Sequence, residues 1–220
     1  MTKTKKIPND KLEKLQLLAF ENCLKVHQDS IMLFKSGSYS TAYFLSVIAL
    51  EEMGKVLWID ETIFQTRVSD MDRDGQEFYL KSIFHHTHKQ GIFVHELGLD
   101  LPKSFLKLIK DKALETKKQN SLYIGLPKKG KDINWNGKII IPKAISKNAV
   151  YKPITMLNDL LLELILGCIK RTTSVDGELM FNAMDRKMYY RLMFNWEHMS
   201  RKTNSRLKAL EAVGEDFEDN

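Results

Sequence analysis

The chain has 220 residues, of which 43% are hydrophobic and 28% are charged, and its formal net charge is +6 at pH 7. This length is ordinary for one domain with its own core, so we expect a single domain over residues 1–220. The positive charge permits an anionic partner such as RNA, but the lysines are spread along the chain and do not by themselves indicate a nucleic-acid groove. The two cysteines match no disulfide or metal-ligand spacing, which favours reduced, packed thiols.

Export and membrane insertion are not expected. Residues 1–10 contain lysines but no apolar core, so they do not resemble a signal peptide. The first of the two most apolar segments is interrupted by Glu51, Glu52 and Lys55, and the second, residues 154–169, contains asparagine, aspartate and glutamate. We therefore expect a soluble, cytoplasmic protein without a membrane partner.

Helical periodicity begins near the N-terminus. Residues 10–35 carry apolar side chains at helical spacing, with Asn9 or Asp10 available as an N-cap and Gly37 as a stop signal. A second helix is expected over residues 40–67. The short turn between them predicts an antiparallel helical hairpin.

The rest of the chain continues the helical pattern with one interruption. Further helices are expected at residues 74–91, 103–119, 153–171 and 177–212. Residues 120–152 are rich in glycine, proline and aromatic side chains, which predicts a loop with at most a short hairpin turning at Asn136–Gly137. The chain ends in an acidic tail, residues 215–220. The predicted fold is all-α, an up-down helical bundle with an irregular insert before its last two helices.

Two carboxylates and one ammonium group lie within the apolar second helix. At about 100° per residue, Glu52 falls in the middle of the apolar stripe and should point into the core. Glu51 and Lys55 are spaced i,i+4, so they can pair along the edge of that stripe. A buried carboxylate requires a cationic or hydrogen-bonding partner from another helix.

The expected partner of these carboxylates comes from the third predicted helix. We expect His88 or Lys89 to reach Glu51 or Glu52 and to form an internal polar network. Such a network could be a structural ion pair that fixes the helix register, or a site for a ligand or phosphate, and the sequence leaves both open. A metal site built from the nearby histidines is not expected, because no carboxylate lies beside them at helical spacing. No cofactor is indicated.

The order of these features resembles the AbiV abortive-infection proteins of the HEPN superfamily of helical bundles. The resemblance covers roughly residues 15–166. It rests on the run from Gly37 to Tyr43, the string Ala49-Leu50-Glu51-Glu52-Met53-Gly54-Lys55, the pair His88-Lys89, and an aromatic insert containing Tyr123, Trp135 and Pro142.

The resemblance implies a HEPN-like bundle that forms a homodimer and defends bacteria against phage. It implies that growth or translation stops when a phage-encoded activator protein engages the chain. Many HEPN proteins are metal-independent ribonucleases with an Arg-x4-6-His motif on the last long helix, and Arg191 and His198 match that pattern.

Helical geometry brings the motif residues together. Arg191 and His198 fall within about 20° of each other on one helix face, and Asn195 lies about 40° from Arg191. The resemblance would make His198 the general acid or base at a ribose and Arg191 the phosphate-binding group. The alternatives are a solvated face or a face packed against the dimer partner. The competing function is a non-catalytic module that docks a protein through residues 120–152.

Overall fold

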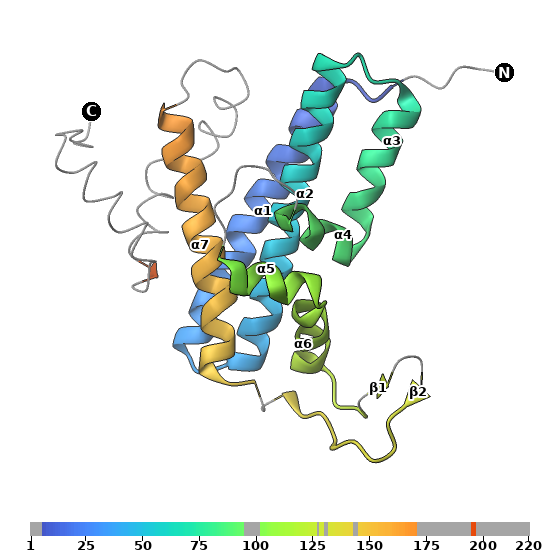
Figure 1. Ribbon diagram of the computed structural model, residues 1–220. Coiled ribbons are helices and arrows are strands. Elements are labelled where there is room, and N and C mark those ends of the chain that lie inside the picture. Colours follow the sequence, from blue (N-terminus) through green and yellow to red (C-terminus); the bar gives the residue numbers. More distant parts are fainter. Residues whose placement is uncertain are drawn as a thin grey trace, which may run out of the picture. The chain divides into compact units, whose positions relative to one another are not determined.

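A computed structural model describes residues 6–94, 102–126, 128–129, 132–142, 145–170 and 195–196 (Figure 1). The chain divides into two compact units, Met1–Pro153 and Ile154–Asn220. Long helices dominate the described residues, so the predicted all-α class is confirmed. The prediction of one domain over residues 1–220 stays a prediction.

The first unit is built on a hairpin of two long helices, α1 (Asn9–Lys35) and α2 (Tyr39–Val68). Their bounds agree with the predicted helices within a few residues, although Pro8 rather than Asn9 or Asp10 occupies the N-cap position of α1. The turn reverses at Gly37, whose φ is +82°, a conformation that favours glycine. The amides of Gly37 and Ser38 close the end of α1 by bonding to the carbonyls of Phe34 and Leu33, at 3.1 and 2.9 Å.

Small side chains let α1 and α2 approach closely. Buried small residues recur on both facing surfaces: Ala19, Cys23 and Ser30 on α1, and Ala42, Ser46 and Ala49 on α2. The Cys23 thiol donates to the carbonyl oxygen of Ala49 at 3.2 Å, which shows how near the two backbones lie. Larger side chains such as Phe20, Leu24 and Leu50 are fully buried around this contact and form the core of the hairpin.

The predicted helix over residues 74–91 is wrong as a continuous element. It is divided into α3 (Arg73–Lys81), the 3-10 turn η1 (Ser82–Phe84) and α4 (His86–Gly91), followed by η2 (Ile92–Val94). The break is at His85, whose backbone is extended, with φ −107° and ψ 122°. Because an extended residue resets the helical phase, the side chains after His85 face different neighbours from those that a continuous helix would give.

The predicted helix over residues 103–119 is also divided. It consists of α5 (Lys103–Lys110) and α6 (Ala113–Leu122). The two are separated by Lys112, which has a positive φ of 55°. The left-handed conformation ends the first helix and redirects the chain, so that α6 packs against α2.

The insert is shorter than predicted and turns elsewhere. It occupies the residues between α6 and α7 (Lys147–Lys170), rather than residues 120–152. Its hairpin consists of β1 (Lys128–Lys129) and β2 (Asp132–Ile133), paired antiparallel, so the prediction that the hairpin turns at Asn136–Gly137 is wrong. A turn does form there, where the Gly137 amide donates to the carbonyl of Asn134 at 3.0 Å. An isolated bridge between Gly125 and Ile140 closes the segment, and the Ser40 hydroxyl bonds to the carbonyl of Pro142.

The second unit contains most of α7, which begins before Pro153 rather than at it. Within this unit the Trp196 indole N–H donates to the Thr155 hydroxyl at 3.0 Å. The predicted helix over residues 177–212 lies outside the described residues except at 195–196, where Asn195 is helical. No helix in the described ranges is both long and apolar enough to cross a bilayer.

One glycine decides how closely α4 packs on α2. A Cβ built on Gly54 would overlap the backbone carbonyl of Lys89, which cannot move as a flexible side chain could. Gly54 therefore lets the backbone of α4 rest directly on α2. Trp58, one helical turn further along α2, supports the same contact by donating its indole N–H to the carbonyl of His88 at 2.9 Å.

We predict that Gly54→Ala destabilises the protein by about 1–3 kcal/mol, because α4 must shift away from α2 to admit the methyl group. Urea unfolding followed by circular dichroism measures this change. Gly91→Ala is the matched control, since a Cβ at Gly91 meets no atom within 4 Å. Equal stability of the two variants would contradict the close contact.

Candidate functional site

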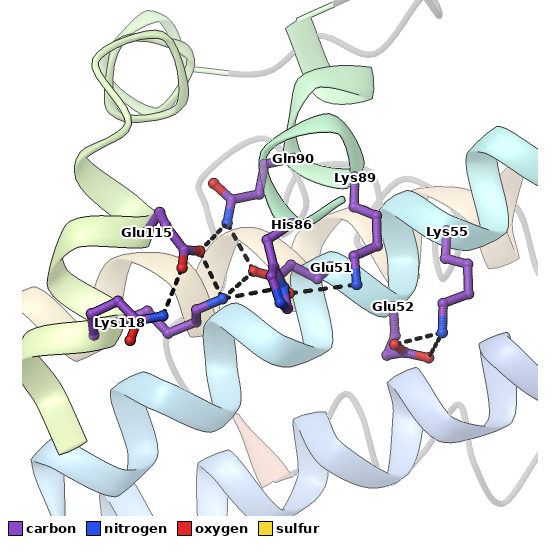
Figure 2. Close-up of polar contacts among 9 residues, drawn as sticks. Glu51, Glu52, Lys55, His86, Lys89, Gln90, Glu115 and Lys118 are labelled. Carbon is purple, nitrogen blue, oxygen red and sulfur yellow. Dashed lines mark hydrogen bonds and ion pairs between the residues drawn. The ribbon is translucent and has the colours of Figure 1, made fainter. Parts of the chain in front are cut away.

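Three helices of the first unit bring polar side chains together around one carboxylate. Glu51 lies in the middle of α2, and α4 and α6 reach it from two directions (Figure 2). We call this group the Glu51 cluster. Its members are Glu51, His86, Lys89, Gln90, Glu115 and Lys118.

Both oxygens of Glu51 are occupied. Oε1 accepts hydrogen bonds from Lys118 Nζ at 2.7 Å and from Gln90 Nε2 at 2.9 Å. Oε2 lies 2.6 Å from His86 Nδ1 and 3.7 Å from Lys89 Nζ. Glu51 is 1% exposed and Lys118 is 2% exposed, so this ion pair is shielded from water. Charge-assisted bonds of this kind compensate for the loss of hydration at a buried carboxylate.

Lys118 joins Glu51 to a second carboxylate on its own helix. Its ammonium lies 2.7 Å from Glu115, so two carboxylates and the ammonium groups of Lys118 and Lys89 balance in charge. Burial is the largest single influence on the pKa of Glu115, and by itself it would raise that pKa. Hydrogen bonds from Lys118 and Gln119, with the charges of Lys118 and His86, outweigh burial and hold the pKa of Glu115 below its ordinary value.

His86 links the buried cluster to solvent. Its side chain is 56% exposed, whereas that of Glu51 is 2% exposed. Because Nδ1 lies 2.6 Å from a carboxylate oxygen, Nδ1 must carry the hydrogen, and it cannot also accept one from Lys118, 3.4 Å away. The tautomer inferred from this geometry leaves Nε2 as the ring nitrogen without a hydrogen.

The donor atoms of Glu51, His86 and Glu115 lie within 4.8 Å of one another, a spacing that can hold a metal ion. Lys118, however, contacts both carboxylates, so its ammonium fills the position between them. A divalent ion would have to displace Lys118 and leave its buried charge without these partners. The contacts therefore favour the interpretation of the cluster as an internal ion-pair scaffold.

The predicted pairing within α2 is wrong. Lys55 pairs with Glu52, with Nζ 2.8 Å from both carboxylate oxygens, and not with Glu51. Glu52 is buried as predicted, but Glu51, which the helical periodicity placed at the edge of the stripe, is buried more deeply. The cause is that α1 covers one side of α2 while α4 and α6 cover the other.

The negative charge of Glu52 also acts on the thiol of Cys23, which is a free cysteine. Burial, and to a lesser extent the charge of Glu52, raises the pKa of this thiol well above its ordinary value. The thiol therefore stays protonated, which agrees with the packed, reduced cysteine expected at this position.

Of the two predicted partners on α4, Lys89 reaches Glu51 and His88 does not. The His88 ring packs on His85 with a centroid distance of 5.0 Å. His86 makes the contact in its place. The extended backbone at His85 shifts the helical phase, so that His86, two residues before the predicted His88, faces α2.

The sequence interpretation missed His86, Gln90, Glu115 and Lys118. Lys118 left a usable signal, because it follows Leu114 by four residues and precedes Ser121 by three, and all three are buried on one face of α6. A lysine that shares a helix face with a leucine and a small serine is a candidate for a buried ion pair. Glu115 and Gln90 left no comparable signal.

The predicted catalytic group, Arg191, Asn195 and His198, falls almost entirely outside the described part of the chain. Arg191 and His198 lie outside the described residues, and Asn195 is helical and exposed. The proposal that these three residues share a face stays a prediction.

The AbiV family model, HEPN_AbiV, matches residues 11–163 of this chain. The match includes every residue of the Glu51 cluster and ends before Arg191. No curated protein matches the chain. No solved structure matches it either.

We predict that Lys118→Met destabilises the protein by about 3 kcal/mol or more, because it leaves Glu51 with less positive charge in a buried position. Glu51→Gln should also destabilise. The double variant should lose less stability than the sum of the two, because neither charge is then left without its partner. Urea unfolding of the four proteins measures the coupling, and strict additivity would contradict the pair. Lys117→Met, at the exposed neighbour of Lys118, is the control.

We also predict that Glu115 stabilises the fold in a pH-dependent way. Its pKa is lowered on folding, so its contribution is fully present above the ordinary value of 4.5 and is lost as the pH falls through the folded value. The stability difference between wild type and Glu115→Gln should therefore be constant near neutral pH and shrink in acid. Urea unfolding at a series of pH values measures it, and a difference that does not change with pH would refute this assignment.

Proposed function

Because this chain belongs to the AbiV family of HEPN proteins, a family that points to abortive-infection defence, we propose that it arrests host growth or translation on phage infection. The observation that carries this proposal is the family match over residues 11–163. The all-α architecture supports it, since a helical bundle is the fold expected for this family.

In this proposal the chain acts as a homodimer that a phage-encoded protein activates, and RNA is its target. Arg191 would bind the phosphate and stabilise its developing charge, while His198 would transfer a proton to or from the ribose. Their spacing on one helical face supports these roles, as does Asn195 between them, which is helical and exposed. No metal is required for this chemistry.

The Glu51 cluster has a different part in the proposed function. Its carboxylates and ammonium groups are paired with one another, and only the His86 imidazole is substantially exposed. We therefore assign the cluster to scaffolding, because it holds α4 and α6 on α2.

A second candidate function is binding without catalysis, through the insert between α6 and α7. Several large apolar side chains are exposed there, among them Trp135 at 78%, Ile124 at 75% and Ile139 at 63%. Exposed aromatic and aliphatic side chains on one segment are typical of protein-binding surfaces. In this case the arrest would come from docking to a phage protein or to the translation machinery.

We predict that cells expressing the chain stop protein synthesis after phage infection, which incorporation of labelled methionine measures. If the protein is a ribonuclease, Arg191→Ala and His198→Ala abolish the arrest while the variants stay folded. If it acts by docking, those variants keep the arrest and Trp135→Ser with Ile139→Ser abolishes it. Phe78→Ser, at an exposed phenylalanine on α3, is the control for a general surface effect.

The ribonuclease mechanism has a direct test in solution. Purified protein is incubated with total bacterial RNA in EDTA, and the cleavage products are separated on a gel. Cleavage by wild type but not by His198→Ala supports the mechanism. If wild type and His198→Ala cleave equally, His198 is not the catalytic group.

A further inference from the structure

A groove of about 900 Å³ lies between α1 and α3, away from the Glu51 cluster. Leu12, Leu80 and Ile83 are nearly buried, at 1% to 8% exposure, and form its apolar floor. Leu18 and Phe84 stand at its sides with 53% and 77% of their surface exposed. The groove thus presents apolar side chains to solvent in a concave surface, which is typical of a binding site.

The rim of the groove is positively charged. Lys11, Lys14, Arg73 and Lys81 lie among the lining residues with a single carboxylate, Glu77. A hydrogen bond from Lys81 at 3.1 Å, with the charges of Lys81 and Arg73, lowers the pKa of Glu77, so this carboxylate is already compensated. Within the described part of the chain, Lys11 and Lys14 form no ion pair. The rim therefore has positive charge available for a partner.

Hydrogen bonds hold the two walls of the groove together. Gln76 on α3 is 2% exposed and bonds twice to the backbone of Ile7, just before α1. Its Oε1 accepts from the Ile7 amide at 2.9 Å, and its Nε2 donates to the Ile7 carbonyl at 3.2 Å. These bonds fix the positions of the two walls, so the groove is formed before a partner binds and no free energy is needed to order it.

The spacing of the lining residues along α1 fits a short partner helix. Lys11, Leu15 and Leu18 follow one another on α1 at i, i+4 and i+7, a distance of about 10 Å along the helix axis. A partner helix of two to three turns presents its own apolar side chains at the same spacing. Acidic residues on its flanks would meet the charged rim.

We propose that the groove between α1 and α3 binds an amphipathic helix of a partner protein, with an apolar face flanked by aspartate and glutamate. The inference rests on the proposed function only in that the chain is engaged by another protein. It locates that contact on α1 and α3 and separates it from the insert.

The test uses two synthetic peptides of about 16 residues with the same leucine stripe. One has glutamates and the other lysines on its flanks, and each is labelled for fluorescence anisotropy with the full-length protein. We expect the glutamate peptide to bind at least about tenfold more tightly at low salt. Leu18→Glu should weaken its binding by about tenfold or more, whereas Met32→Glu, at an exposed position of α1 outside the groove, should not.

A charge-reversed variant makes the test independent of the apolar side chains. Lys14→Glu with Arg73→Glu should turn the preference toward the lysine peptide. Thermal unfolding of each variant confirms that it is folded. If Leu18→Glu does not fold, Leu15→Glu takes its place. Equal binding of both peptides to wild type, or unchanged binding to the folded groove variants, would overturn the proposal.

Other occupants of the groove give distinct results. If sedimentation shows a wild-type dimer that becomes a monomer in Leu18→Glu, the occupant is a second copy of this chain and the proposal is wrong. If removal of residues 215–220 raises peptide affinity by about tenfold, the acidic tail competes for the groove and the proposal is also wrong. Failure of the growth-arrest experiment would instead contradict the proposed function, because peptide binding does not depend on arrest.

Discussion

The buried carboxylate of Glu51 is the constraint on which the rest of the first unit depends. A negative charge that is 1% exposed requires compensation, and the compensating groups come from two other helices. Lys118 ties α6 to α2, and His86, Lys89 and Gln90 tie α4 to α2. The contact of the Lys89 backbone with Gly54 fixes the same interface sterically.

In the first unit, the polar cluster that joins the helices is distinct from the surfaces that are exposed to solvent. The carboxylates and ammonium groups of the Glu51 cluster balance in charge, and all its members except His86 are buried or nearly so, which favours a role in specifying which helices pack together over a role in binding a ligand. The surfaces that we propose for partners lie elsewhere in the first unit. They are the exposed apolar side chains of the insert and the groove between α1 and α3, whose rim contains Lys11, Lys14, Arg73 and Lys81.

The accuracy of the sequence interpretation followed the strength of the local signals. The bounds of α1 and α2 were predicted within a few residues because both helices are long and are joined by a turn at Gly37. The breaks at His85 and Lys112 were missed, because neither residue is a glycine or proline. The missed break at His85 explains why His88 was chosen in place of His86. Glu52 was predicted to be the more deeply buried carboxylate, but Glu51 is. Every residue from Ala49 to Gly54 is buried, so helical periodicity does not distinguish the two positions.

The sequence by itself determined the all-α class, the helical hairpin, the burial of charge in the second helix and the family resemblance. These features depend on local spacing and on motifs that are continuous in the chain. Only the tertiary structure decided which groups pair with Glu51 and where α1 and α3 leave a groove. His86 and Lys118 are 35 and 67 residues from Glu51, and no local pattern selects among the many polar residues at such separations. Their pairing is set by how three helices pack, because a buried charge takes whichever partner the packing brings within reach.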